Sequence, residues 1–336
     1  MGDVLMLMTQ QYHEKPASNS VPLVWVVDSA YTGELNARIG LAERLGYFYE
    51  VIPIPTENNR DYKQMLKTLY VNSSRGVEQK LLIISGTGEE STAEIADLKT
   101  LFADCLIIYL ASIMPDTPHP RLCEYDLVAS PQYMGSNIIP LISVPHNLTP
   151  DLLASAYQQH AEYFSSLPKP VIGLLLGGNT RYCDGFNAAH GMELGQRIAG
   201  LVNSVAGFLV ISNSRRTPDS ALAALLDNLY GVSYFFFDWR QQDKSFYHAL
   251  LAHADLLIVT GDSLSMCSEA AFTGKPVLVD LSVNATETYH RELVGKLIDY
   301  GAAKLLTDRY ESWSYLPLDP TGDVARIIKD RLGETG

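Results

Sequence analysis

The sequence predicts an α/β protein made of two doubly wound, Rossmann-like domains. The chain has 336 residues, and a prior of ~100–200 residues per domain favours two domains. Short apolar runs alternate with helical patterns along the chain, as in parallel α/β units. The alternation stops at the proline-bounded segment Ser166–Pro170 and then starts afresh. We therefore expect domains at 1–167 and 168–336 that face a cleft, with ligands at the carboxyl ends of the strands.

The first half is an alternation of candidate strands and helices. Apolar runs rich in β-branched residues predict strands, and apolar positions at helical spacing predict helices. The expected strands are Val24–Val27, Phe48–Ile52, Leu81–Ile84, Cys105–Leu110, Leu127–Ala129 and Ile138–Leu141; the expected helices are Asn36–Leu45, Tyr62–Leu69, Ala93–Leu101 and Pro150–Ser165. We interpret Ser166–Pro170, which breaks the last of these helices, as the linker between the domains.

The second half repeats this pattern after Pro170. The expected strands are Val171–Leu176, Gly207–Ile211, Ser233–Phe237, Leu256–Val259 and Val277–Val279; the expected helices are Gly191–Val205, Pro218–Leu229, Ser245–His253, one that begins at Ser265, and Val324–Arg331. The last helix is a candidate to pack back across the cleft between the domains.

Composition and charge exclude several classes of protein. Hydrophobic residues make up 47% of the chain, too many for a disordered protein. The net charge of −13 argues against a nucleic-acid partner, because such proteins need a basic face. The four cysteines are scattered without paired spacing, which indicates free thiols in a reducing compartment. The first residues lack the basic region and the long apolar core that are typical of a signal peptide, and no apolar run reaches ~18–20 residues. We therefore expect a cytoplasmic protein without a transmembrane segment, for which peripheral membrane contact stays open.

The segment LLIVTGDSLSMCSEAAFTGKPVLVD, 256–280, is the most informative part of the chain. It is predicted to be a strand, a turn of small residues, a helix and another strand. Such a turn presents backbone N–H groups and the positive end of a helix dipole to an anion. Glu269 lies early in the helix, where it can bind a sugar hydroxyl while the turn binds a phosphate. The alternative is an ordinary strand–turn–helix of any parallel α/β protein.

Two further loops of the second half follow predicted strands. Gly177-Gly178-Asn179 comes after the first strand, and glycines there would let the backbone approach a ligand. Ser214-Arg215-Arg216 precedes a helix, and guanidinium groups can bind phosphate oxygens bidentately. A tight turn and a solvated charged turn are the structural alternatives. Together, these loops predict a pocket for a nucleoside-diphosphate sugar that comprises Gly177, Gly178, Asn179, Ser214, Arg215, Arg216, Ser263, Ser265, Met266 and Glu269.

The motifs VIGLLLGGNTR, ISNSRRTP and VTGDSLSMCSEAAFTGKPV resemble those of the mitochondrial-fission "elongated mitochondria" family and its bacterial relatives. In the first half, DSAYTGELN, GLAERLG, YDLV and VPHNLT are similar to that family as well. The resemblance spans about residues 22 to 320 and implies a GT-B-like, two-domain glycosyltransferase fold. Bacterial members of the family are regarded as glycosyltransferase-like, whereas a plant member recruits a dynamin-related protein in mitochondrial fission.

The chain departs from the family pattern in its first half. Asn36-Ala37 stands where the family usually has Asn-Gln, and Pro131-Gln132-Tyr133-Met134 stands where it usually has Pro-Glu-His-Asp. Three ionisable positions are thereby lost on the side that would bind the acceptor. The motifs implied to bind the donor are intact.

The first half also contains the candidate catalytic bases. Asp28 ends the first strand, His146 follows the last strand, and Glu34 is a third candidate. One of them would deprotonate the acceptor hydroxyl. A turn-capping aspartate and a structural histidine are the alternatives. The chain has no Asp-x-Asp motif and no histidine cluster with ligand spacing, so we expect no metal and no cofactor.

The function predicted from the sequence is metal-independent glycosyl transfer. The donor is a nucleotide-diphosphate sugar bound by the second domain, and the acceptor is unknown, with a glycolipid or a cell-envelope saccharide as candidates. The alternative is a non-catalytic interaction protein of the mitochondrial-fission type that keeps a vestigial donor site. A dehydrogenase and a serine hydrolase are disfavoured, because the chain lacks both Gly-x-Gly-x-x-Gly after its first strand and Gly-x-Ser-x-Gly.

Overall fold

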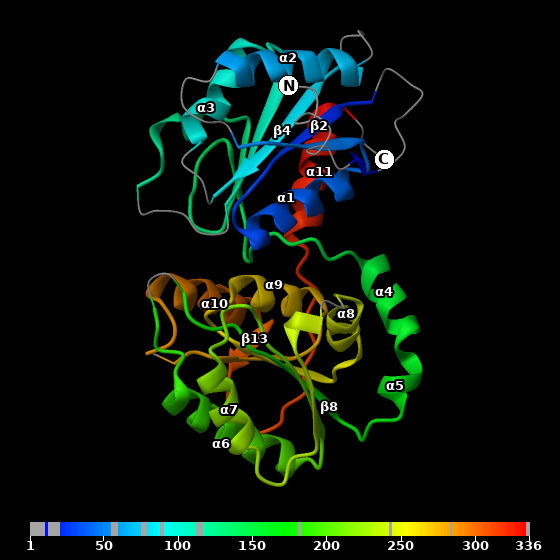
Figure 1. Cartoon of the computed structure of the whole chain (residues 1–336), viewed down its shortest axis with the longest axis vertical. Coiled ribbons are helices and arrows are strands. Elements are labelled where there is room, and N and C mark those ends of the chain that lie inside the picture. Colours follow the sequence, from blue (N-terminus) through cyan, green and yellow to red (C-terminus); the bar gives the residue numbers. More distant parts are fainter. Residues whose placement is uncertain are drawn as a thin grey trace. The chain divides into compact units, whose positions relative to one another are not determined.

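The structure is a computed structural model that describes residues 11–12, 21–54, 60–74, 79–87, 91–111, 117–180, 183–241, 244–282 and 284–333. The chain divides into two compact units (Figure 1). The first comprises Met1–Asn147 together with Asp319–Gly336, and the second comprises Leu148–Leu318. Each unit is built around its own sheet.

In the described part of the first unit, seven strands form one sheet in the order β1-β3-β2-β4-β5-β6-β7. Every neighbouring pair is parallel except β1 with β3. The strands are β1 (Gln11–Tyr12), β2 (Leu23–Val27), β3 (Tyr49–Ile52), β4 (Leu81–Gly86), β5 (Cys105–Leu110), β6 (Leu127–Ser130) and β7 (Ile138–Pro140). The sequence did not reveal the two-residue strand β1.

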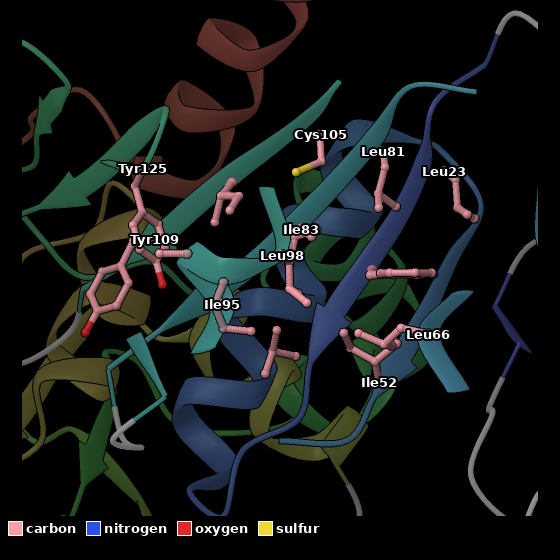
Figure 2. Packing of buried hydrophobic residues seen from close by; sticks show 14 of the residues in the cluster. Leu23, Ile52, Leu66, Leu81, Ile83, Ile95, Leu98, Cys105, Tyr109 and Tyr125 are labelled. Atoms are coloured by element: carbon pink, nitrogen blue, oxygen red, sulfur yellow. The ribbon is translucent and has the colours of Figure 1, made fainter. Parts of the chain in front are cut away.

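Helices cover both faces of this sheet. They are α1 (Thr32–Leu45), α2 (Arg60–Ser74), α3 (Thr92–Asp97) and α11 (Pro320–Leu332), with short 3₁₀ helices at Leu98–Thr100 and Pro120–Glu124. Successive residues of β2 point to opposite faces. Trp25 packs in one buried cluster with residues of α2 and α3, and Val26 packs in another with residues of α1 and α11. Figure 2 shows the first of these clusters, in which Leu66 from α2 and Ile95 from α3 lie over the sheet. The doubly wound fold is therefore confirmed for this unit.

The second unit has the same plan. Within its described residues, six parallel strands follow the order β10-β9-β8-β11-β12-β13. They are β8 (Val171–Leu175), β9 (Phe208–Ser212), β10 (Tyr234–Phe237), β11 (Leu256–Thr260), β12 (Val277–Asp280) and β13 (Ala303–Leu305). The helices are α4 (Pro150–Gln159), α5 (Ala161–Ser165), α6 (Ala188–Ser204), α7 (Asp219–Asp227), α8 (Lys244–His253), α9 (Leu264–Phe272) and α10 (Thr288–Tyr300), with a 3₁₀ turn at Trp239–Gln241.

The boundary between the units differs from the expected one at 167/168, because α4 and α5 pack on α8. The His253 ring of α8 stacks between Tyr157, at a centroid distance of 3.9 Å, and Phe164, at 4.5 Å. His160 Nε2 lies 2.9 Å from Ser245 Oγ. This aromatic packing ties the segment before Ser166–Pro170 to the second unit, so the division falls after Asn147.

The C-terminal helix α11 belongs to the first unit, whereas the sequence analysis assigned 168–336 to the second. Figure 1 shows α11, in red, beside α1, in blue. Val324 and Ile328 are buried against the first sheet, and Asp319, which caps α11, forms a 2.8 Å ion pair with Arg44 of α1. The apolar stripe of α11 completes the core over one face of that sheet.

Helix α10 and strand β13 were not predicted from the sequence. The buried positions of α10 include His290 beside Leu293, Val294 and Leu297, which weakens its apolar stripe. In β13 only Ala303 is buried. The four cysteines are free. None of the described helices is long and apolar enough to cross a membrane.

Candidate functional site

Three loops of the second unit lie together at the carboxyl ends of β8, β9 and β11. These strands are neighbours in the sheet, so the loops 177–179, 214–216 and 261–263 meet at one edge. The Ser214 hydroxyl donates to the Gly177 carbonyl at 2.7 Å, which joins the first two loops directly. The structure thus brings together the loops that the sequence analysis singled out.

Asp262 links the third loop to the other two. No role was predicted for this residue from the sequence. Its side chain is 2% exposed. Its Oδ2 accepts the Gly178 N–H at 2.5 Å and lies 3.4 Å from Arg216 Nη1. Burial raises the pKa of Asp262 to about 6, although the Arg216 charge and the hydrogen bonds to the carboxylate oppose this rise. The buried carboxylate therefore organises the edge of the sheet.

The close approach of Asp262 explains the two glycines after β8. A Cβ at Gly177 would lie 2.0 Å from Asp262 Oδ2. A Cβ at Gly178 would lie 2.0 Å from the Arg216 carbonyl oxygen, and the φ of Gly178 is +151°. Any larger residue at either position would clash with the neighbouring loop. In the sequence, the glycine pair therefore indicated that another group approaches this turn closely. It did not indicate which group this is.

The backbone N–H groups of this glycine turn are used inside the protein. The Gly177 N–H donates to Thr260 Oγ1 at 2.8 Å, and the Gly178 N–H donates to Asp262. The Asn179 N–H donates to the Arg216 carbonyl at 3.1 Å. Such groups were expected from the sequence to bind a phosphate, but these three N–H groups already donate to neighbouring loops of the protein.

The two arginines of the second loop have different environments. Arg216 is partly exposed, but its guanidinium is engaged within the protein and donates to the carbonyls of Gly178 and Asn179, both at 3.1 Å, and to that of Asp262 at 3.2 Å. Arg215 is exposed, and its side chain forms no hydrogen bond or ion pair with the described residues. Only Arg215 of this pair offers an unengaged guanidinium to a ligand.

The N-terminus of α9 lies at the same edge of the sheet. Ser263 is its N-cap residue, and no side chain among the described residues caps the first turn. Ser265 and Met266 are half-buried in that turn. The N–H groups of a first helical turn lack intrahelical acceptors and favour an anion. This turn therefore keeps the anion-binding capacity that the glycine turn has lost.

Glu269, one helical turn further along α9, pairs with a residue that the sequence analysis did not identify. The Tyr247 hydroxyl of α8 donates to Glu269 Oε2 at 2.5 Å. Removal of solvent raises the pKa of Glu269 to about 7, and the hydrogen bond from Tyr247 opposes the rise. Tyr247 thus orients the carboxylate that was predicted to bind a ribose.

A further cluster of polar side chains, which includes His290, is near enough to Arg216 for its charge to act on His290. The Thr180 hydroxyl donates to Glu287 Oε1, and His290 Nδ1 lies 3.8 Å from the same carboxylate oxygen. Burial lowers the pKa of His290. Among the described residues, no three His, Cys, Asp or Glu side chains gather as metal ligands. Metal independence stays a prediction.

In the first unit, a buried arginine ties the strand-end loops together. Arg38 of α1 is 1% exposed. Its guanidinium donates to the carbonyls of Val27, Asp28 and Thr87 at 2.8, 2.7 and 2.8 Å. These residues follow or end β2 and β4, which are neighbours in the sheet. Arg38 was not predicted from the sequence, because the residues around an arginine within a helix do not indicate that it is buried.

Asp28 and Glu34 both lie at this edge. Asp28 is half-buried, and the contact found for its carboxylate in the described chain is the 2.7 Å hydrogen bond from the Ser29 N–H. Glu34 Oε2 accepts the Thr87 hydroxyl at 2.9 Å. Asp28 thus keeps more of its carboxylate available to an incoming hydroxyl than Glu34 does.

His146 lies in a different environment. It is 3% exposed, and its backbone N–H and carbonyl both bond to Thr321 Oγ1 of α11, at 2.9 and 2.7 Å. Burial and the Arg44 charge lower the pKa of His146 to about 3. A buried imidazole of such low basicity is poorly suited to take a proton from an acceptor at neutral pH.

The altered segment of the first unit follows β6. The N–H groups of Gln132 and Tyr133 both donate to Ser130 Oγ at 3.0 Å. Met134 is 82% exposed. Hydrogen bonds to the Ser130 hydroxyl therefore fix the start of this loop, and the loop exposes one apolar side chain.

A model of the mitochondrial fission ELM1 family matches residues 32–332. The Arabidopsis thaliana mitochondrial fission protein ELM1 is 24% identical over 339 residues, which cover 90% of this chain and 77% of that protein. An uncharacterized Rickettsia prowazekii protein, RP120, is 29% identical over 201 residues. That match covers 58% of this chain and 55% of RP120, about half of the relative's length.

Solved structures resemble the fold. The UDP-GlcNAc 2-epimerase from Methanocaldococcus jannaschii has a TM-score of 0.53 at 11% identity, over 92% of this chain and 99% of that one. The Neisseria meningitidis UDP-GlcNAc 2-epimerase bound to UDP-GlcNAc has a TM-score of 0.50 at 13% identity, over 93% of each chain. Arabidopsis thaliana UGT89C1 complexed with quercetin has a TM-score of 0.50 at 10% identity, over 94% of this chain and 91% of that one. The chain belongs to the mitochondrial fission ELM1 family and has the GT-B-like fold of nucleotide-sugar enzymes.

Proposed function

From this family membership and fold, we propose that the chain is a metal-independent glycosyltransferase whose second unit binds a nucleoside-diphosphate sugar. One observation carries the proposal. The unengaged guanidinium of Arg215 and the uncapped first turn of α9 extend from loops that hydrogen bonds tie together at one edge of the sheet. Both favour anions, and neither is used by another part of the described protein.

In the proposed complex, Arg215 and the first turn of α9 bind the diphosphate. The carboxylate of Glu269 accepts the ribose hydroxyls, and Tyr247 holds it in place. Arg216 and the glycine pair keep the loops in position instead of contacting the donor. This division of roles follows from the contacts that Arg216, Gly177 and Gly178 already make.

Asp28 is the base that we propose for an inverting transfer. Its carboxylate would take the proton of the acceptor hydroxyl while that oxygen bonds to the anomeric carbon. The bond from this carbon to the diphosphate oxygen breaks, and the diphosphate leaves with the electron pair. Arg215 and the α9 dipole would neutralise the leaving group without a divalent ion. Glu34 is the second candidate base.

Titration calorimetry with a panel of nucleoside diphosphates tests the donor site. Arg215→Ala should weaken binding by ~1.5–3 kcal/mol, the range for a hydrogen bond to a charged group. Stability should not change, because Arg215 has no partner among the described residues. Arg309→Ala, at an exposed position of the same unit, serves as the control and should bind as the wild type does. Equal affinity of the Arg215 variant and the wild type would exclude this role for Arg215.

A donor-hydrolysis and transfer screen with a panel of nucleotide sugars tests catalysis. Turnover that persists in a chelator and falls in Glu269→Gln would support the enzyme. Activity lost to the chelator and restored by magnesium or manganese would contradict the metal-independent mechanism.

The alternative is an interaction protein with a vestigial donor site. One observation favours it: the backbone N–H groups of the turn 177–179 are all occupied within the protein. A chain that binds no nucleoside diphosphate and hydrolyses no donor would fit this alternative. The Arabidopsis relative, a mitochondrial fission protein, suggests a partner of the membrane-fission machinery in that case.

A further inference from the structure

A groove of about 340 Å³ lies in the second unit between α4, the end of α8 and the turn 273–275. Its walls are mainly apolar and include Leu153 and Tyr157 of α4 and Ala252 of α8. Tyr157 is 49% exposed, although one face of its ring stacks on His253. Gln158, Thr273 and Lys275 add the polar part of the lining.

Lys275 is the positively charged residue of the groove, and no carboxylate of the described residues pairs with it. It is half-buried, and its ammonium forms no ion pair within the described part of the chain. Asp255 is the acidic group that acts on it, but Asp255 Oδ2 accepts the Val171 N–H at 2.8 Å and lies 3.6 Å from Lys169. Burial lowers the pKa of Lys275, and the second lysine lowers it further. An anion in the groove would supply the missing charge partner.

The groove is built before any ligand arrives. The Lys275 N–H donates to Thr273 Oγ1 at 3.1 Å, and the Lys275 carbonyl accepts the Tyr315 hydroxyl at 2.7 Å. The intervening Gly274 has a φ of +72°. These bonds fix the turn, while the stack of Tyr157 on His253 fixes the opposite wall. Preformed walls reduce the entropy that binding costs.

The groove is separate from the candidate donor site. Asp255 precedes β11 and Lys275 precedes β12, so both lie at the amino ends of these parallel strands. The donor-site loops follow the carboxyl ends of β8, β9 and β11. The two sites therefore occupy opposite ends of one sheet.

We propose that this groove binds a free aliphatic carboxylate of medium chain length. The carboxylate pairs with Lys275, and the hydrocarbon chain lies on Leu153, Tyr157 and Ala252. The volume is at the low end of the ~300–1,000 Å³ of small-molecule sites, which suits one aliphatic chain. The net charge of the whole chain is −13, so the attraction for an anion is local to the groove.

Titration calorimetry of the full chain with octanoate tests the site. We expect saturable binding of octanoate, weaker binding of octan-1-ol and none of acetate. Lys275→Met should weaken octanoate binding about 10- to 100-fold, the effect of losing one charge-assisted hydrogen bond. Lys275→Arg should retain binding. Lys296→Met, at an exposed position of α10, is the matched control and should bind as the wild type does, and thermal melting checks that each variant is folded.

Three results would overturn the proposal. The first is equal octanoate affinity in the Lys275→Met variant and the wild type, and the second is equal affinity of the wild type for octanoate and octan-1-ol. The third is the absence of octanoate binding. If the chain then sediments with phosphatidylserine vesicles but not with phosphatidylcholine vesicles, and this depends on Lys275, the groove binds a bilayer surface in place of a free carboxylate.

Discussion

At the carboxyl edge of each sheet, one buried charged side chain links the loops that follow the strands. The charge is positive in the first unit and negative in the second. In the first unit, the Arg38 guanidinium binds three carbonyl oxygens of the strand-end loops. In the second unit, the Asp262 carboxylate accepts a backbone N–H and faces Arg216. Both side chains are nearly inaccessible to solvent, at 1% and 2% exposure.

The difference determines which groups each edge can offer to a ligand. A buried cation occupies carbonyl groups, and the side chains left around it in the first unit include the carboxylates of Asp28 and Glu34. The buried anion occupies an N–H group and faces Arg216, and the second unit keeps the unengaged Arg215 and a helix N-terminus. The first edge is therefore suited to accept a proton, and the second to bind an anion.

The largest expected effect is on catalysis at the first edge. Asp28→Asn should lower the transfer rate by ~10²–10⁴-fold, because it removes the proposed base. Donor affinity should not change, since Asp28 does not contact the diphosphate in the proposed complex. Initial rates with the donor found in the screen measure the effect. A smaller loss in Asp28→Asn than in Glu34→Gln would transfer the role to Glu34, and His146→Gln should leave the rate within the same order of magnitude.

Removal of the buried cation should destabilise the first unit strongly. Arg38→Met would leave three carbonyl groups without their donor, and an unsatisfied buried group costs ~1–3 kcal/mol. We expect the free energy of unfolding to fall by about 3 kcal/mol or more. Urea unfolding measures this quantity. Arg326→Met, at an exposed position of α11, is the control; if it destabilises the chain as much as Arg38→Met does, burial is not the cause.

The buried anion of the second unit should make stability depend on pH. The pKa of Asp262 is raised to about 6 in the folded chain from 3.8. Such a group stabilises the folded state below its unfolded pKa, and this contribution is lost as the pH rises through the folded pKa. A shift of about two units corresponds to about 3 kcal/mol. The stability of Asp262→Asn relative to the wild type should therefore rise by about that amount between about pH 4 and pH 7.

Urea unfolding at the two pH values measures this change. Asp219→Asn is the matched control, because the Asp219 side chain is 81% exposed. A relative stability of Asp262→Asn that does not depend on pH would show that Asp262 does not titrate as its burial requires.

The smallest expected effect concerns the close packing of the second edge. Gly178→Ala should destabilise the chain by about 1–3 kcal/mol, because the new Cβ meets the Arg216 carbonyl at a positive φ. Gly200→Ala in α6 is the control, since no described atom beyond the neighbouring backbone of α6 lies within 4 Å of its Cβ position. It should stabilise the chain by about 0.5–1 kcal/mol. Calorimetric melting compares the two, and a neutral Gly178→Ala would mean that the loops can separate at little cost.

The candidate site could be predicted in part from the sequence. The loops 177–179, 214–216 and 261–263 follow apolar strands of one parallel series, and parallel strands end at the same edge. Their proximity was therefore predictable. Which of their polar groups remain available was not, because the Gly178 N–H and the Asp262 carboxylate are 84 residues apart. Local patterns carry no information about such a pairing.

The base candidates illustrate the same limit. Asp28 and His146 are both polar residues that follow a predicted strand, and the sequence could not choose between them. Tertiary packing separates them: α11, from the other end of the chain, covers His146 and lowers its pKa, whereas Asp28 keeps an accessible carboxylate.

The sequence by itself determined the two doubly wound units, because a period of two in strands and of 3.6 in helices records which side chains face a core. It also determined the family, whose motifs lie in the loops at the strand ends. Only the tertiary structure decided that α4 and α5 belong to the second unit and α11 to the first. It also decided that Arg38 and Asp262 are the buried charges of the two edges. Burial of a polar side chain depends on neighbours distant in sequence, and its hydrogen-bond partners are known only when the chain has folded.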